Sequence, residues 1–361
     1  MDIFDDDEDM FGNDAEILEI VDYGFPKRIY LRRNHFEDLD NLTFFQRFRL
    51  TKNTVLNILP LIEEKLEYPT DINNSLSPMD QLLTCLRFYA TGGHLSTISD
   101  FMGTHVSTSS RIIKNVSIAL ASLSHAYIKM PTENNIQKIQ RDFYNIALFP
   151  SIVGCIDGTH IKIQSPGGED GEIFRNRKGY FSINVQVVGD SDLKVQDIVA
   201  RWPGSTHDMT IYSNSRIRAR LEGGEFRNGI ILGDSGYGVG KYLLTPLQNP
   251  ETAAEKLYNK AHITTRNSVE RLFGVWKRRF PILAYGIRLK LATAYAVIVA
   301  SAVLHNISIS MHEEEPPEPD INADEFENLI QVGNIPEVIN GDNIQGNVRR
   351  NEMINYFNRL L

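Results

Sequence analysis

The sequence predicts an α/β domain with a mixed sheet and flanking helices over residues 146–311, preceded by an all-helical region over residues 21–145. Up to about residue 122 the apolar residues recur at spacings of three and four, which is the period of an amphipathic helix. From about residue 150 short runs rich in Val and Ile follow one another, as in strands. Successive strands followed by helix, strand and helix are typical of a mixed sheet with helices packed on it.

The charge of the chain is unevenly distributed. Its 361 residues have a formal net charge of −9, which taken alone disfavours a nucleic-acid-binding protein. Residues 1–20 carry nine acidic and no basic residues, and residues 313–361 carry eleven acidic residues and three arginines, so residues 21–312 have a net charge of +8. A basic body between acidic ends keeps nucleic acid open as a partner.

Both ends of the chain are predicted to be tails. Residues 1–20 are acidic with few apolar side chains, so burial cannot offset the entropy lost on ordering. Residues 312–361 form an acidic, Pro- and Asn-rich C-terminal tail, in which a short docking helix over 351–361 is the alternative. The apolar stretch 291–307 is short and interrupted by polar residues, so we expect a buried core helix and no membrane association. The two cysteines lack the spacing of a zinc site or a disulfide framework.

The second half of the helical region has the outline of a helix-turn-helix motif, over residues 82–122. Its first helix ends at Gly103 and its second begins at Ser107. Small hydroxyl side chains and Arg111 at the start of the second helix suit contacts with phosphates and base edges. An ordinary helical hairpin, capped by these serines, is the alternative. Earlier helices are predicted over residues 42–50, 52–66 and 77–90.

Within the α/β domain, two apolar runs end in an aspartate beside a glycine. Asp157 ends the first run and Asp234 the last predicted strand, so each carboxylate is expected at the C-terminal edge of its strand, where open α/β sheets bind ligands. Carboxylate oxygens are the ligands that Mg²⁺ and Mn²⁺ prefer. Strands are predicted over residues 151–156, 160–164, 180–188, 195–200 and 229–233, and helices over 207–214, 267–283 and 289–310.

A third acid, Glu270, lies on the predicted helix 267–283. One side of this helix carries an apolar stripe, and the opposite side places Glu270 beside Arg266, Gly274 and Lys277. Gly274 costs about 1 kcal/mol in a helix interior, so it indicates either room for a ligand or close packing of another helix. An exposed salt-bridge face is the alternative interpretation of Glu270. The stripe consists of Val269, Leu272, Phe273, Trp276, Phe280 and Leu283.

Longer strings surround these acids. In chain order they are CIDGTHIKI (155–163), NRKGYFSINVQVV (176–188), PGSTHD (203–208), LGDSGY (232–237) with LLTP (243–246), and VERLFGVWKRRF (269–280). They resemble the successive blocks of the PIF/Harbinger transposase family, in the family's order, and above all its domesticated, transposase-derived nuclease branch. LRFYATG (86–92) resembles part of the family's helix-turn-helix region, so the similarity covers about two thirds of the chain. Trp276 stands where Leu is more usual.

The resemblance implies an RNase H-like fold and a metal-dependent endonuclease that cleaves DNA phosphodiester bonds. Asp157, Asp234 and Glu270 match the DDE triad, which is implied to be catalytic and to coordinate two divalent cations, Mg²⁺ or Mn²⁺. One cation would activate the attacking water or 3′-hydroxyl and the other would stabilise the leaving oxygen. The triad has no missing member.

Further polar residues accompany the triad. Asp208 could add a metal ligand or cap a helix, and His207 precedes it in the same block. His160 could transfer a proton, although a hydrogen-bonded strand histidine is the alternative. Basic residues in the helix-turn-helix candidate and around the triad are candidates for contact with nucleic acid, with simple solvation as the alternative. These basic candidates are Arg111, Arg175, Arg177, Lys178, Arg266, Lys277 and Arg278.

The resemblance also implies DNA as the substrate, a Myb/SANT-like DNA-binding protein as a partner, and a nuclear location, with the cytoplasm and an oligomeric state left open. A different class of function is kept beside the nuclease: a domesticated DNA-binding or adaptor protein that retains the fold without cleaving DNA. A nuclease directed at RNA is a third hypothesis. Salt-dependent binding without metal-dependent cleavage would favour the adaptor.

Overall fold

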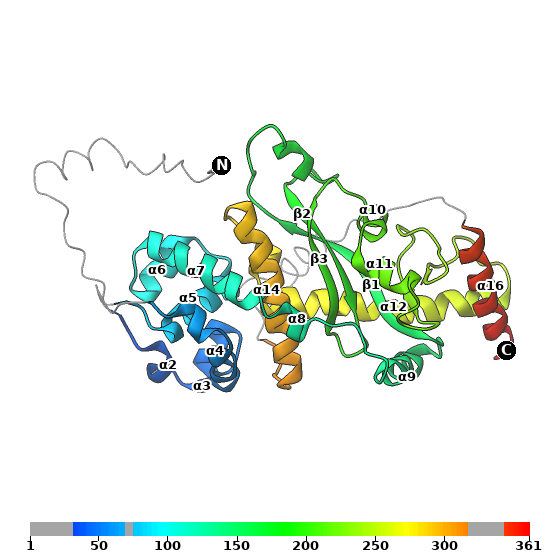
Figure 1. Cartoon of the computed structure of the whole chain (residues 1–361), viewed down its shortest axis with the longest axis horizontal. Helices are drawn as coiled ribbons and strands as arrows, with labels where there is room; N and C mark the ends of the chain where they lie inside the picture. Colours follow the sequence, from blue (N-terminus) through cyan, green and yellow to red (C-terminus); the bar gives the residue numbers. More distant parts are fainter. Residues whose placement is uncertain (1–31, 69–74, 317–342) are drawn as a thin grey trace, which may run out of the picture.

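The computed structural model describes residues 32–68, 75–316 and 343–361, so the predicted N-terminal tail, residues 1–20, lies outside the described residues. In the described part, every element before residue 150 is helical, and the strands lie between residues 152 and 244. Figure 1 shows the helices of residues 35–121 at one end of the molecule, and the sheet with its helices, which include the helix of residues 136–147, toward the other. The expected mixed sheet with flanking helices is confirmed.

The sheet has five strands in the order β3-β2-β1-β4-β5. β1 pairs antiparallel with β2, and β2 with β3, whereas β4 runs parallel to both β1 and β5. β1 is therefore the central strand, with an antiparallel half on one side and a parallel half on the other. The strands are β1 (Ile152–Lys162), β2 (Ser182–Gly189), β3 (Val195–Pro203), β4 (Ile230–Leu232) and β5 (Leu243–Leu244).

The two faces of the sheet bury two apolar clusters. The larger cluster contains Cys155 and packs against α12 (Ala253–Arg279) and α14 (Leu291–Ser310). The smaller contains Ile156 and packs against α10 (Asp208–Ser213) and α11 (Arg216–Glu222). Successive side chains of a strand point to opposite faces, so Asp157 shares the face of Cys155 and is directed toward α12.

α12 crosses the sheet and is much longer than the predicted helix 267–283 (Figure 1). It begins with a capping box, in which the Thr252 hydroxyl accepts from the Glu255 amide and the Glu255 carboxylate accepts from the Thr252 amide. Its first half was missed because the buried positions there include small and polar residues. Every member of the predicted apolar stripe is buried, at most 1% exposed. The predicted end of the helix at residue 283 is wrong, because α12 ends at Arg279, Phe280 is its C-cap residue and Leu283 lies on the next short helix.

α14 is the core helix that the sequence predicts. By length and composition it could cross a membrane, but 72% of its most apolar window is buried inside the protein. It packs against α7 (Val106–Ala121) and β3. Asn306 fixes it to β3, because its Oδ1 accepts from the Val195 amide at 2.8 Å and its Nδ2 donates to the Val195 carbonyl at 2.7 Å. α13 (Ile282–Tyr285) joins α12 to α14.

The helices up to residue 121 pack around α5 (Pro78–Thr91) and α7, whereas α8 (Ser124–Tyr127) packs on α14, and α9 (Ile136–Ala147) packs on β1 and α12. Gly92 and Gly103 end α5 and α6 in the left-handed conformation, with φ of 59° and 61°, which explains why glycine occupies both turns. The helices are α2 (His35–Asp38), α3 (Asn41–Phe48), α4 (Lys52–Leu66), α5 (Pro78–Thr91), α6 (Leu95–Met102), α7, α8 (Ser124–Tyr127) and α9 (Ile136–Ala147).

Residues 312–316 and 343–361 of the predicted C-terminal tail, residues 312–361, lie within the described part of the chain. Residues 344–358 form α16 (Ile344–Asn358), which packs on α12 at the end of the molecule opposite the helical region (Figure 1). The ring centroid of Phe357 lies 5.3 Å from that of Phe149 and 6.1 Å from that of Tyr258. The docking helix that the sequence offered as the alternative is therefore present, and it is longer than residues 351–361.

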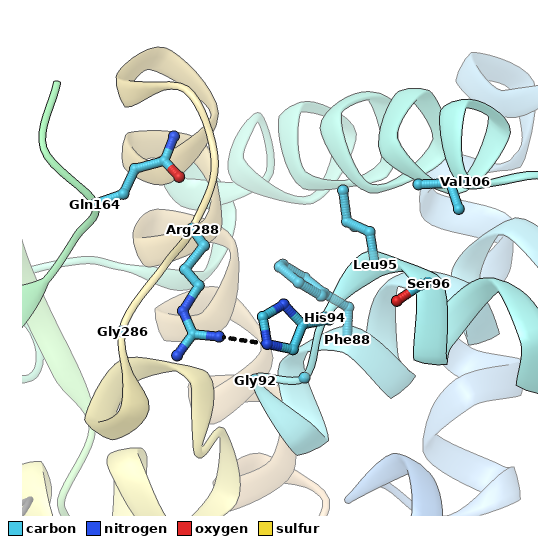
Figure 2. A pocket seen from close by; sticks show the side chains of 10 residues that line it. Phe88, Gly92, His94, Leu95, Ser96, Val106, Gln164, Gly286 and Arg288 are labelled. Carbon is cyan, nitrogen blue, oxygen red and sulfur yellow. Dashed lines mark hydrogen bonds between the residues drawn. The ribbon is translucent and has the colours of Figure 1, made fainter. Parts of the chain in front are cut away.

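A cavity of about 400 Å³ lies where the helical region meets the α/β domain. Figure 2 shows His94, at the start of α6, and Arg288, before α14, pointing toward each other in it, with Nε2 and Nη1 3.1 Å apart. The Asp157, Asp234 and Glu270 side chains do not line this cavity, so it is separate from the candidate site.

Candidate carboxylate site

Asp157 lies in the middle of β1, which corrects the expectation that it ends a strand. The predicted strands 151–156 and 160–164 are one continuous strand. Gly158 does not interrupt it, because its missing side chain makes room for a neighbour: a Cβ there would lie 2.4 Å from Asp208 Oδ1. The glycine beside the aspartate therefore marks a close approach rather than a turn.

Arg266 joins two of the candidate acids. Its Nη1 lies 3.0 Å from Asp157 Oδ2, and its Nη2 contacts Glu270 Oε1 one turn further along α12. The side chains of Asp157 and Arg266 are 13% and 16% exposed, whereas that of Glu270 is 42% exposed. A strand carboxylate and a helix carboxylate thus flank a single guanidinium group.

Asp234 follows β4 and comes from the neighbouring strand. β1 and β4 are parallel with Cys155 opposite Leu232, and Asp157 and Asp234 each follow their member of this pair by two residues. Asp234 Oδ1 accepts a hydrogen bond from the Gly236 amide at 2.9 Å. The negative charge of Asp234 raises the pKa of Asp157.

The pKa of Asp157 is raised from 3.8 to about 7. Burial is the main cause, and the negative charges of Asp234 and Glu270 raise this pKa further. Arg266 and the hydrogen bond from the Gly158 amide act in the opposite direction. Asp157 is therefore a buried carboxyl whose negative charge Arg266 stabilises and the charges of Asp234 and Glu270 oppose.

Two further titratable groups near β1 have shifted pKa values. Lys277, on α12, is 1% exposed, and burial lowers its pKa to about 7, opposed by the charge of Asp157 and assisted by Lys178. Burial, with Lys277, Lys178 and Arg177, lowers the pKa of His160 to about 4. The ring of His160 lies 3.0 Å from the Ser182 hydroxyl, so it is a hydrogen-bonded strand residue that is neutral at pH 7.

Asp208 and His207 lie on the other side of β1. Asp208 is the first residue of α10, and its Oδ1 accepts from Asn184 Nδ2 at 2.7 Å. His207 is the N-cap residue of α10 without a side-chain cap hydrogen bond, and its Nε2 lies 2.9 Å from Arg177 Nη2. Asp208 therefore lies in the first turn of α10 and also accepts a hydrogen bond from β2.

Gly158→Ala is expected to lower the free energy of unfolding by about 1–3 kcal/mol, because the new Cβ overlaps the Asp208 carboxylate and forces the backbone beside Asp157 to move. Gly274→Ala is the matched control. A Cβ there meets no atom within 4 Å, which rules out close helix packing, so this change should stabilise α12 by up to about 1 kcal/mol. Urea unfolding of the two variants checks both signs; equal effects would contradict the packing argument.

The other basic candidates are distributed differently. Arg175 is held by Glu172, with contacts of 2.7 and 3.1 Å, and lies 4.4 Å from the Phe181 ring centroid. Arg278 pairs with Glu315 at 3.6 Å. Arg111 is exposed on α7. The positive charges of Arg177 and Lys178 help to lower the pKa of His160. Arg175 and Arg278, in contrast, each pair with a carboxylate elsewhere.

The serines of the helix-turn-helix candidate also separate into two kinds. Ser109 is fully buried, and its hydroxyl lies 2.9 Å from that of Ser99 and 2.7 Å from that of Thr104, so it holds the turn together. Ser107 lies 2.7 Å from His105 Nδ1 at the start of α7. The sequence missed the internal role of Ser109 and the burial of Lys277; the i, i+4 spacing of Arg266 and Glu270 was the signal for their ion pair.

The donor set suits a divalent cation by its chemistry, since three carboxylates supply anionic oxygens and Asp157 needs a positive charge beside it. In the described ranges, however, no three His, Cys, Asp or Glu side chains are grouped closely enough to hold a metal ion as they stand. The guanidinium of Arg266 lies between two of the three acids.

The fold and its acids define an α/β domain with carboxylates on one strand, just after the adjoining strand and on a helix. Comparison with known proteins gives the family of this domain. Residues 156–306 match the family model described as DDE superfamily endonuclease. The chain is 31% identical to the human protein named "Putative nuclease HARBI1" over 286 residues, 77% of this chain and 81% of the human one, and 32% identical to the mouse protein of that name with the same coverage. It is 27% identical over 315 residues to "Protein ALP1-like" of Arabidopsis thaliana, with 81% of this chain and 75% of that protein covered. No solved structure gives a significant match.

The chain therefore belongs to the DDE superfamily endonucleases, with relatives in the transposase-derived HARBI1 group. The resemblance found in the sequence is confirmed at the level of the family.

Proposed function

We propose that this protein is a metal-dependent endonuclease that cleaves DNA phosphodiester bonds with Asp157, Asp234 and Glu270 as its catalytic acids. The observation that carries the proposal is the meeting of Asp157 and Glu270 on one guanidinium, with Asp234 raising the pKa of Asp157 from the adjoining strand. Family membership supports nuclease chemistry as the use of this cluster.

Mg²⁺ or Mn²⁺ is the proposed cofactor, held by the three carboxylates, and it would supply charge stabilisation at the phosphate and an activated water or hydroxyl group. The chain itself contributes several carboxylates that are partly buried from solvent, and such a set favours a dication over a monovalent ion. Arg177 and Lys178 are exposed near His160 on β1 and are proposed to contact a phosphodiester backbone, whereas Lys277 is buried and is not available for such a contact.

The test is nicking of supercoiled DNA by the purified protein. Cleavage should require Mn²⁺ or Mg²⁺ and stop in EDTA, and Glu270→Gln should lower it by about a hundredfold, because a metal site contributes several kcal/mol and each 1.36 kcal/mol is tenfold. Asp170→Asn, an exposed acid outside the site, is the control. Cleavage that persists in EDTA, or equal rates in all three proteins, would reject the assignment. DNA binding without cleavage would favour the adaptor function, and a preference for RNA competitor the RNA-directed nuclease.

The helix pair α6–α7 is proposed to bind DNA through the exposed side of α7. Arg111 and Lys114 are exposed there one turn apart, while Ser109 on the same helix is buried in the turn. Arg111→Gln with Lys114→Gln should weaken DNA binding and reduce the salt slope by about 2, since each phosphate contact contributes about 0.9. Lys256→Gln, an exposed lysine on α12, is the control in fluorescence anisotropy titrations at several salt concentrations. An unchanged slope would leave α6–α7 as an ordinary hairpin.

A nuclear location and a Myb/SANT-like DNA-binding partner belong to the same proposal. Both follow from DNA as substrate and from the family's transposase origin, and they are tested by imaging of the tagged protein and by co-purification with a candidate partner. A purely cytoplasmic protein would contradict the nuclear part.

The acidic ends are proposed to limit indiscriminate binding to phosphates, and deletion of residues 1–20 should then raise non-specific DNA affinity.

A further inference from the structure

Arg266 is placed as a counter-ion within the carboxylate cluster. Its two Nη atoms are shared between Asp157 of β1 and Glu270 of α12, so one guanidinium satisfies two acids from different elements. Its side chain is only 16% exposed, which distinguishes it from a solvated surface arginine. The planar fork of a guanidinium makes such a two-sided contact possible, whereas a lysine would act as a point charge.

The position of this guanidinium has a consequence for metal binding. A dication held by Asp157 and Glu270 needs the same carboxylate oxygens that now face Arg266. Two positive groups cannot occupy the space between these acids without strong repulsion. As placed, the three acids do not form a metal-sized group within the described residues.

We propose that Arg266 is an internal competitor of the metal: a divalent cation binds Asp157 and Glu270 only by displacing the guanidinium from between them. The inference rests on the proposed function for the identity of the metal ligands. Arg266 thereby stabilises the metal-free protein and weakens its affinity for the cation. It acts through the acids, so it is a positioning residue and not a catalytic one.

Mn²⁺ is the probe, and its binding to the full chain is measured by isothermal titration calorimetry without DNA. Arg266→Met, which retains much of the side-chain volume, should bind Mn²⁺ about tenfold more tightly than the unmodified protein, a gain of about 1.4 kcal/mol. Its melting temperature in EDTA should fall, and added Mn²⁺ should raise it by more than in the unmodified protein. Arg271→Met, an exposed neighbour on the same helix, should change neither quantity.

Arg266→Lys is the second variant, in case Arg266→Met fails to fold. It keeps the positive charge without the planar guanidinium, so it should bind Mn²⁺ with intermediate affinity. A purely structural arginine would lower the melting temperature without changing Mn²⁺ affinity, and that result would overturn the proposal. Weaker Mn²⁺ binding by Arg266→Met would overturn it as well. If neither protein binds Mn²⁺, both this inference and the proposed function fail. Tighter binding by Arg266→Met in a protein that cleaves no DNA would uphold the inference and reject the nuclease.

Discussion

Asp157→Asn is expected to lower Mn²⁺-dependent DNA cleavage by about three orders of magnitude while leaving the metal-free protein folded. The amide keeps the size of the side chain but removes an anionic oxygen at the centre of the cluster. A metal site contributes several kcal/mol to the transition state, and each 1.36 kcal/mol is tenfold in rate, so losing the most buried acid should cost about 10³. The loss should exceed that of Glu270→Gln, because Glu270 is more exposed.

The same substitution should make the metal-free protein more stable at high pH. The pKa of Asp157 is about 7 in the folded chain against 3.8 as its ordinary value, so the folded state binds more protons than the unfolded state between about pH 4 and pH 7. The free energy of unfolding therefore falls as the pH rises through this window, and above it the full cost of the buried charge is present. The neutral amide of the Asp157→Asn variant would carry no such cost.

Urea unfolding in EDTA at pH 5 and pH 8 measures this effect. The stability of Asp157→Asn relative to the unmodified protein should rise from the lower to the higher pH, and Asp170→Asn should show no such trend. A variant that loses stability equally at both pH values would show that the ion pair with Arg266 outweighs the burial of the carboxylate. Cleavage by Asp157→Asn at the normal rate would remove Asp157 from the mechanism.

Much of the site could be predicted because its pattern is local. A carboxylate after an apolar run, and Glu270 opposite a stripe of large apolar residues, are visible in the order of residues alone. The sequence also predicted the change from helices to strands near residue 150 and the core helix α14. The mid-strand position of Asp157 could not be predicted, because Gly158 indicates a turn unless Asp208, fifty residues later, is known to lie against it.

The sequence also did not predict that charged groups would be buried, and this error has one physical cause. Lys277 and Arg266 lie on the polar side of α12 by periodicity, which predicts solvent. The polar side instead faces β1, where Asp157 supplies the compensating charge, so these residues are covered. Periodicity shows which side chains share a face of a helix but not what that face meets, and here it meets an acid from a distant strand.

Glu313→Ala is expected to lower the free energy of unfolding by about 3–5 kcal/mol, although the sequence places Glu313 at the start of a tail. Its side chain is 2% exposed and pairs at 3.0 Å with Arg279, which is 1% exposed at the end of α12. Its other oxygen accepts from the amide and hydroxyl of Thr51 at 2.8 and 2.9 Å. Burial lowers the pKa of Arg279, with the charge of Glu313 opposing, so removing the carboxylate leaves a buried cation without its partner.

This residue therefore joins the end of α12 to the N-cap of α4, which links the helical region to the α/β domain. Glu314→Ala is the matched control, since the Glu314 side chain is exposed and only its carbonyl accepts from Arg279 Nη2, at 2.9 Å. Arg279→Met combined with Glu313→Leu should lower the free energy of unfolding by less than Glu313→Ala does. Replacing both members of a buried ion pair by apolar side chains costs less than removing one member and leaving the other charge buried. Midpoints of urea unfolding for the three proteins decide the matter: a Glu313→Ala variant as stable as Glu314→Ala would mean that this buried pair does not hold the two parts together.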